Sequence, residues 1–258
     1  MRWLTVGLLS LLLAFEATAA EPPRASLQYR NTLIRTARFV WGMDAPIPML
    51  AAQIETESAW RPGVSSRFAS GLTQFTPRTA AQIAEDFPNE VGFPADVFNP
   101  GWAMRAQSRY MKVIYDSVIL SACDSARFIF TTAGYNGGPH NIVRDRILTE
   151  QNGHDPTRWW GNVELFSNRA DWAMDENRMY PIRIWDRQPK YAGWGTMVPR
   201  DCEEEEIIAV VTPEPEPEPE PPAIVEPEPN NPGFVFVVVG VFLSGLGAAV
   251  YFNKRGKT

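Results

Sequence analysis

Two glutamates near the end of an expected helix are the side chains best placed for acid–base chemistry. Residues 49–57 have a helical apolar pattern, with Leu50 and Ile54 on the inner face. Glu57 follows Ile54 by three residues and projects from that face, whereas Glu55 lies about 200° away around the helix and points outward. A carboxyl group on an apolar face under a loop is partly desolvated, so its pKa rises and it stays protonated near neutral pH. Glu57 therefore fits a general acid, although most glutamates at helix ends are solvated surface groups.

Histidine and cysteine offer little further chemistry. His140 and His154 are the only histidines, so we expect no histidine-rich metal site, and no sequence signature indicates a cofactor. The two cysteines, Cys123 and Cys202, form either one disulfide or two buried thiols, and their spacing does not choose between these alternatives.

The elements that must position Glu57 are helices. Apolar periodicity and capping residues predict an all-α domain, with Asp124 capping the fifth helix and Pro181 interrupting the last one. A loop rich in serine and glycine, 63–71, follows the Glu57 helix. Residues 151–171 show little periodicity, and their Trp159 and Trp160 suit either stacking on sugar rings or burial. The expected helices cover residues 26–41, 49–57, 79–87, 100–117, 125–135, 141–148 and 175–185.

Charge is distributed unevenly along the chain. Residues 21–200 contain 18 Asp and Glu against 20 Lys and Arg, a formal charge of +2, whereas residues 201–228 contain 11 acids and no base. The net charge of −6 therefore comes from the acidic stretch. Neither part has the basic surface typical of a nucleic-acid-binding protein, so we expect no nucleic-acid partner.

Both ends of the chain carry targeting signals. Residues 1–20 combine Arg2, an apolar run and small residues before a cleavage point, which is the layout of a signal peptide. Residues 233–252 lack charge and are long enough to span a membrane, and the basic tail at 253–258 predicts a cytoplasmic C-terminus. Between them, residues 201–232 form an acidic Pro-Glu linker, expected to be disordered and extended. These boundaries leave 21–200 as the globular domain.

Three sequence blocks resemble a known family. They are Glu57–Pro62 (ESAWRP) with Gly71–Pro77 (GLTQFTP), then Ala133–Pro139 (AGYNGGP), then Glu176–Ile184 (ENRMYPIRI). In this order they resemble the soluble lytic transglycosylases, lysozyme-like enzymes that cleave peptidoglycan. The chain departs from the family pattern at Thr73, where methionine is usual, at Phe68, where glycine is usual, and at Gly137, where alanine is usual.

The resemblance implies a mechanism with one catalytic carboxylate. Glu57 would protonate the glycosidic oxygen between MurNAc and GlcNAc, then take the proton of the MurNAc C6 hydroxyl as this oxygen attacks C1. The product is a 1,6-anhydromuramoyl end. The resemblance implies six further site residues: Ser58, Gln74, Tyr135, Asn136, Glu176 and Tyr180. They would bind the acetamido groups, hold the muramoyl ring or orient Glu57. Each of them also suits a purely structural role.

Two alternatives stay open at this point. A hydrolytic muramidase on the same fold needs a second carboxylate to activate water, for which Asp86, Asp96 and Glu176 are available. A wall-binding component of an envelope-spanning or phage-entry apparatus would need no turnover. For all three functions we expect peptidoglycan strands as the partner and a single-pass protein of the cytoplasmic membrane with its domain on the periplasmic side. The span itself, with Gly240 and Ser244 at small-xxx-small spacing, also suits self-association.

Overall fold

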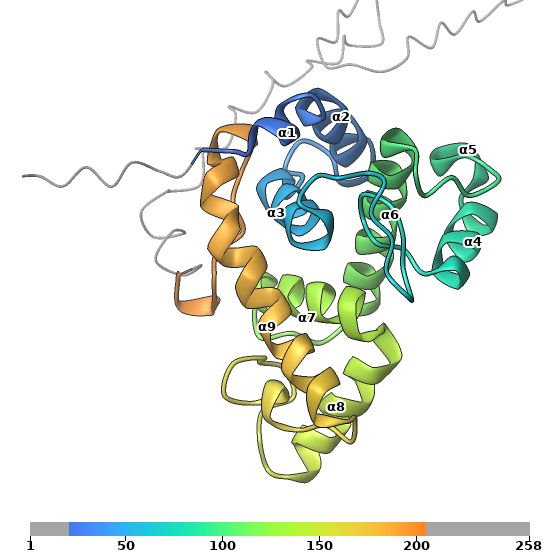
Figure 1. Cartoon of the computed structure of the whole chain (residues 1–258). Coiled ribbons are helices and arrows are strands. Elements are labelled where there is room, and N and C mark those ends of the chain that lie inside the picture. Colours follow the sequence, from blue (N-terminus) through green and yellow to red (C-terminus); the bar gives the residue numbers. More distant parts are fainter. Residues whose placement is uncertain (1–20, 205–258) are drawn as a thin grey trace, which may run out of the picture. The chain divides into compact units, whose positions relative to one another are not determined.

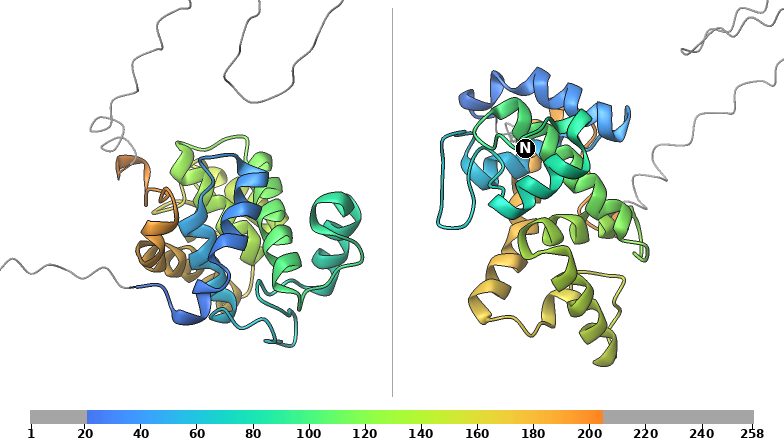
Figure 2. Two further views of the ribbon diagram at one scale, coloured as in Figure 1. Left: turned by 90° about the horizontal axis from the view of Figure 1, so that it is seen from above. Right: turned by 90° about the vertical axis from the view of Figure 1, so that its right-hand side faces the viewer.

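The computed structural model describes residues 21–204, and these are helical as expected (Figures 1 and 2). Between residues 21 and 204 there is no β-strand, only isolated bridges that pair Ser70 with Ser65 and with Phe75. The all-α prediction is therefore confirmed for this region. The helices are α1 (Arg24–Leu27), α2 (Arg30–Trp41), α3 (Ile47–Ser58), α4 (Pro77–Asp86), α5 (Pro88–Val91), α6 (Pro100–Ser117), α7 (Asp124–Gly137), α8 (Pro139–Gln151) and α9 (Asp171–Arg187), with 3₁₀ helices η1 (Val163–Leu165) and η2 (Gln188–Trp194).

Helix α3 is the most enclosed element around the site. Nine of its twelve residues are buried, including Met49, Leu50 and Ile54. Helices α2 and α9 and the η2 turn pack against it, so apolar burial, rather than helix propensity, holds α3 in place. Its last residues, which include Glu57, therefore sit on a rigid support.

Helix α9 packs against both α3 and α7 (Figure 1). Tyr180 and Ile184 are buried in these contacts. The prediction that Pro181 interrupts the helix is wrong, because α9 runs through it from Asp171 to Arg187. A proline removes one backbone hydrogen bond from a helix, and burial of this segment on two neighbouring helices offsets that loss.

Local caps fix where several helices begin. Thr76 accepts a hydrogen bond from Thr79 N at 3.2 Å and Asn99 accepts one from Gly101 N at 2.9 Å, as expected for residues that precede a proline at a helix start. Asp124 is not the cap of α7. Cys123 takes that position, and its Sγ accepts a hydrogen bond from Ala126 N at 3.3 Å.

Three further differences concern helix limits. The expected helix 26–41 is divided at Gln28 and Tyr29 into α1 and α2, and residues 88–91, which lie outside the expected helices, form the short helix α5. The helix after Pro139 is longer than expected and ends at Gln151.

A loop of residues 59–76 connects α3 to α4 and projects from the helices (Figure 2). Ala59, Trp60 and Gln74 adopt positive φ angles of 50°, 62° and 50°, which are unusual for residues other than glycine. Gly71 has φ +83°, and a Cβ at this position would lie 1.9 Å from the carbonyl oxygen of Val97. Only glycine fits there, because the backbone approaches the segment before α6 so closely.

Cys123 and Cys202 form a disulfide with an S–S distance of 2.09 Å, which decides between the two alternatives left by the sequence. The bond closes a loop of 79 residues. Native disulfides of this kind stabilise a fold by about 2–5 kcal/mol, because they restrict the unfolded chain. Cys202 lies beyond the predicted domain boundary at residue 200 and is buried.

The predicted signal peptide (1–20), membrane span (233–252) and tail (253–258), and all but the first four residues of the predicted linker (201–232), lie outside the described residues. Among residues 21–204, none of the helices combines the length and the apolar character needed to cross a membrane.

Candidate functional site

Glu57 lies on the last turn of α3 with its carboxyl group turned into the protein. Burial raises the pKa of Glu57 to about 7. A hydrogen bond from the Tyr180 hydroxyl to Glu57 Oε1 lowers this pKa, and the negative charge of Glu176 raises it further. A carboxyl group with a pKa near 7 can both donate and accept a proton at neutral pH, which is what a group acting first as acid and then as base requires.

A chain of buried hydrogen bonds extends from Glu57 into the core. Gln53 Nε2 donates to the Tyr180 hydroxyl oxygen at 3.1 Å, and Gln107 Nε2 on α6 donates to Gln53 Oε1 at 2.7 Å. Gln53 and Gln107 have no exposed surface, and Tyr180 is 2% exposed. Because the Tyr180 hydroxyl accepts from Gln53, its own proton is directed to Glu57. The chain thus fixes the position of the carboxyl group.

Glu55 points away from Glu57, as the helical spacing predicts, but it does not face solvent. Its side chain is 12% exposed and is covered by η2, where Lys190 Nζ lies 2.5 Å from Oε1 and the Tyr191 hydroxyl donates to Oε2 at 2.7 Å. The expectation of an outward Glu55 is therefore wrong, because a segment distant in sequence folds over it. Glu55 joins α3 to η2 through an ion pair.

Glu57 opens onto a cleft of about 580 Å³. Its walls come from the end of α3, the 59–76 loop, the end of α7, the start of α8 and the first turns of α9. Four of the predicted site residues line it together with Glu57. They are Gln74, Tyr135, Asn136 and Glu176.

Each of these four side chains is held by a neighbour. Gln74 Nε2 donates to Gly71 O at 2.8 Å, and the Tyr135 hydroxyl donates to Thr73 O at 2.8 Å, so both are attached to the loop. Burial, and then the charge of Glu57, raises the pKa of Tyr135, which keeps its hydroxyl protonated. Asn136 Oδ1 accepts from Asn177 at 3.0 Å, and Glu176 forms an ion pair with Arg183 at 2.6 Å. The cleft therefore presents fixed polar groups.

Two of the predicted site residues do not line the cleft. Ser58 is 2% exposed, and its hydroxyl donates to Leu72 O at 2.7 Å, so it attaches the loop to α3. Tyr180 lies behind Glu57 and contacts it through the hydrogen bond described above.

The sequence did not indicate Arg169 and Trp172, although both line the cleft. Arg169 lies just before α9 and Trp172 lies in its first turn. Both are at the end of the stretch with little periodicity, so no sequence pattern predicts the direction of their side chains. Trp159 and Trp160 lie elsewhere, since Trp159 is buried in the core and Trp160 lines a small hollow beside Cys202. The exposed aromatic side chains in the cleft are instead Phe68 and Trp172, at 69% and 75% exposure.

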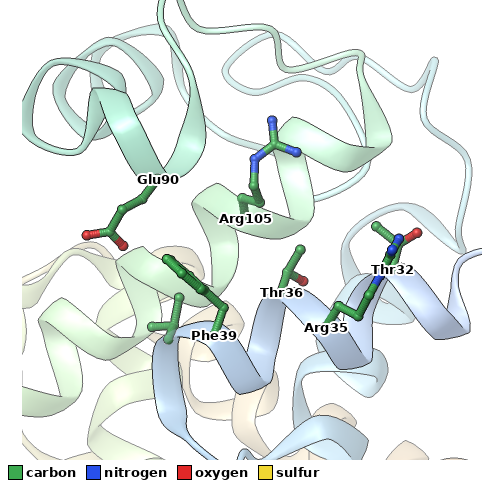
Figure 3. Close-up of a pocket in the computed structure, with 7 residues that line it drawn as sticks. Thr32, Arg35, Thr36, Phe39, Glu90 and Arg105 are labelled. Atoms are coloured by element: carbon green, nitrogen blue, oxygen red, sulfur yellow. The ribbon is translucent and has the colours of Figure 1, made fainter. Parts of the chain in front are cut away.

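A separate hollow of about 200 Å³ lies between α2 and the α5–α6 region (Figure 3). Two of its three ionisable groups are occupied, because Glu90 pairs with Arg109, and Arg105 Nη2 donates to Val91 O at 2.9 Å. None of the residues around Glu57 contributes to it, so we place the candidate site in the larger cleft. In the region 21–204 we find no group of three His, Cys, Asp or Glu side chains that could hold a metal ion.

Comparison with known proteins agrees with this location. Residues 42–155 match the family model described as the transglycosylase SLT domain, and this range contains Glu57, Gln74, Tyr135 and Asn136 but ends before α9. The chain is also similar to membrane-bound lytic murein transglycosylase F of Ectopseudomonas mendocina (strain ymp), with 25% identity over 165 residues. The similarity covers 56% of this chain but only 32% of that relative.

Proposed function

We propose that the protein is a lytic transglycosylase that cleaves peptidoglycan between MurNAc and GlcNAc, on the premise that residues 42–155 match the transglycosylase SLT domain model. The observation that carries the proposal is the half-buried Glu57, with a pKa of about 7, at the floor of an open cleft lined by polar and aromatic groups. The relative's name, a lytic murein transglycosylase, supports the same activity.

The reaction uses one carboxyl group twice. Protonated Glu57 donates its proton to the glycosidic oxygen as the bond from that oxygen to C1 of MurNAc breaks. The C6 hydroxyl oxygen of the same MurNAc bonds to C1, and its proton passes to the Glu57 carboxylate, which restores the acid. No water is consumed, and the products are a 1,6-anhydroMurNAc end and a free C4 hydroxyl on GlcNAc. Gln74, Tyr135 and Asn136 bind the sugar ring and its substituents, and Tyr180 orients Glu57.

Hydrolysis on the same fold is the second candidate, and one observation favours it. Of the three carboxylates that could activate water, Glu176 lines the cleft with Glu57, whereas Asp86 and Asp96 do not. Both carboxylate oxygens of Glu176 are, however, already hydrogen-bonded to Arg183, at 2.6 and 3.1 Å, so an attacking water would have to compete with Arg183 for them.

The mass of the products tests the proposal. The full chain, solubilised in detergent, is incubated with purified peptidoglycan, and the released muropeptides are weighed. Anhydro ends, lighter than reducing ends by one water, are the expected result. Reducing ends would reject transglycosylation in favour of hydrolysis, and intact strands that still bind the protein would indicate a wall-binding component without turnover.

We further propose that the protein is exported and anchored in the cytoplasmic membrane. The apolar stretch 233–252, the basic residues after it and the signal-like residues 1–20 support this topology, as does the relative's description as membrane-bound. Residues 201–232 then separate the domain from the membrane. Alkaline extraction of membranes checks the anchor: the full chain should stay in the membrane pellet, and a Val238→Asp/Val239→Asp variant should be released. Release of the unaltered chain would contradict the proposal.

A further inference from the structure

Arg169 places part of its guanidinium group in the cleft wall. Its Nη2 lies 2.5 Å from Asp145 Oδ2 and 3.0 Å from Asn177 Oδ1, and its Nε donates to Ser167 Oγ at 3.0 Å. The Nη1 group has no hydrogen-bond partner within residues 21–204. It lies beside Gly137, where a Cβ would be only 2.6 Å away. Because Gly137 has no side chain, there is room beside it for the Nη1 edge of the Arg169 guanidinium group, whose N–H donors are free to bind a ligand.

A small hollow of about 90 Å³ adjoins the cleft at this point. It shares Asn141 and Arg169 with the cleft and is also lined by Arg144 and Asp145. Arg144 is exposed and has no ion-pair partner in the described part of the chain. Asp145 has a side chain that is 4% exposed and already paired with Arg169, so the charge that a ligand would meet here is positive.

The chemistry of the proposed substrate supplies a matching group. The sugar rings and acetamido groups of a glycan strand are neutral, whereas the peptide stems on alternate sugars end in carboxylates. Guanidinium groups bind carboxylates through paired N–H donors. We propose that Arg144 and Arg169 bind a carboxylate of the peptide stem, at a subsite beside the saccharide cleft. This inference rests on the proposed function.

The subsite is testable by binding, apart from catalysis. In a Glu57→Gln background the full chain is pulled down with three strand preparations immobilised on beads: native strands, strands with stem carboxylates capped as N-methyl amides, and strands stripped of their stems. We expect native strands to bind roughly tenfold more tightly than capped strands, the range of a charge-assisted hydrogen bond. Stripping leaves a lactyl carboxylate on the sugar, and these strands should bind as weakly as capped ones.

Arg144→Ala should abolish the preference for native over capped strands. Arg144 lies on the exposed side of α8, where alanine favours the helix. Arg35→Ala is the matched control, because Arg35 is also an exposed helical arginine but lies on α2, where it lines the separate hollow (Figure 3) and not the cleft. Arg169→Lys tests the second arginine while leaving a positive charge for Asp145, and it should reduce the preference.

Each contrary outcome has a distinct meaning. Equal binding of native and capped strands by the parent protein, or an equal loss in Arg35→Ala and Arg144→Ala, would overturn the subsite alone. Tight binding of stripped strands would assign the carboxylate to the lactyl group and overturn recognition of the stem. No binding to any strand would overturn the proposed function and the subsite together.

Discussion

Glu57→Gln is expected to reduce glycan cleavage by at least about 10²- to 10⁴-fold, the range that a positioned general acid–base group contributes. Glutamine keeps the size of the side chain and can accept the hydrogen bond from Tyr180, but it has no proton to donate to the leaving oxygen. Release of anhydromuropeptides per folded enzyme is the measurement. Full activity of Glu57→Gln would contradict the assignment, whichever product is formed.

The control for this variant is Glu55→Gln. It makes the same chemical change two residues away, on the same helix. Glu55 contacts Lys190 and Tyr191 rather than the cleft, so its replacement should lower the free energy of unfolding and leave turnover per folded molecule unchanged. A loss of turnover in both variants would mean that the integrity of α3, and not the acid at residue 57, limits the reaction.

The raised pKa of Glu57 also predicts how activity and stability depend on pH. The acid form is needed to start the reaction, so activity should fall as the pH rises through about 7. Burial disfavours the charged form, so the folded state holds its proton more tightly than the unfolded state between pH 4.5 and about 7. Folding stability should therefore decline over this window as pH rises, by up to about 3 kcal/mol at about 1.4 kcal/mol per pKa unit.

Two variants check this dependence. Glu57→Gln should lose the decline, so that its melting temperature exceeds that of the parent protein more at pH 8 than at pH 5. Tyr180→Phe removes a hydrogen bond that lowers the pKa of Glu57, and should move the alkaline fall in activity to higher pH. An unchanged pH profile in Tyr180→Phe would show that the hydroxyl does not act on Glu57.

Gly71→Ala should destabilise the protein by about 3–5 kcal/mol, because a new Cβ would overlap a backbone oxygen and the residue would keep a positive φ. The oxygen belongs to Val97 and cannot rotate away as a side chain could. Displacing Gly71 also moves Leu72 and Thr73, whose carbonyls accept hydrogen bonds from Ser58 and Tyr135. We therefore expect both the melting temperature and glycan cleavage to fall.

Gly153→Ala separates the two causes. Gly153 also has a positive φ, +76°, but no atom lies within 4 Å of the position of its Cβ. It should lose only about 1–2 kcal/mol from the left-handed backbone. Denaturant unfolding of the two variants measures the difference, and equal losses would show that backbone strain, rather than the contact with Val97, makes glycine necessary at residue 71.

Sequence patterns predicted the features that depend on neighbours in the chain. The spacing of Ile54 and Glu57 placed the carboxyl group on the inner face, and Thr76 and Asn99 marked helix starts through caps that act over three residues. The structure brings Gln74, Tyr135, Asn136 and Glu176 together with Glu57 in one cleft. Their roles in binding or catalysis remain proposals.

Features that depend on distant contacts were not predictable from local patterns. Glu55 is covered by η2, which follows it by more than 130 residues, and Pro181 stays in a helix because α3 and α7 both pack against α9. Arg169 faces the cleft because Asp145 and Asn177 hold it there, and residues 151–171 have no periodicity that would assign its direction. Each case depends on tertiary packing that overrides the preference of a short segment.

The Cys123–Cys202 bond also determines how the domain responds to mechanical tension. A pull applied to the chain beyond residue 204 meets the cross-link before it reaches η2 or α9, since Cys202 is the point at which that end is joined to the start of α7. The loop of 79 residues that the bond closes includes Tyr135, Asn136, Arg169 and Tyr180, and it cannot be drawn out into an extended chain while the bond is intact. About half of the residues that line the cleft are thereby shielded from the force, which passes to the first half of the fold through a covalent link.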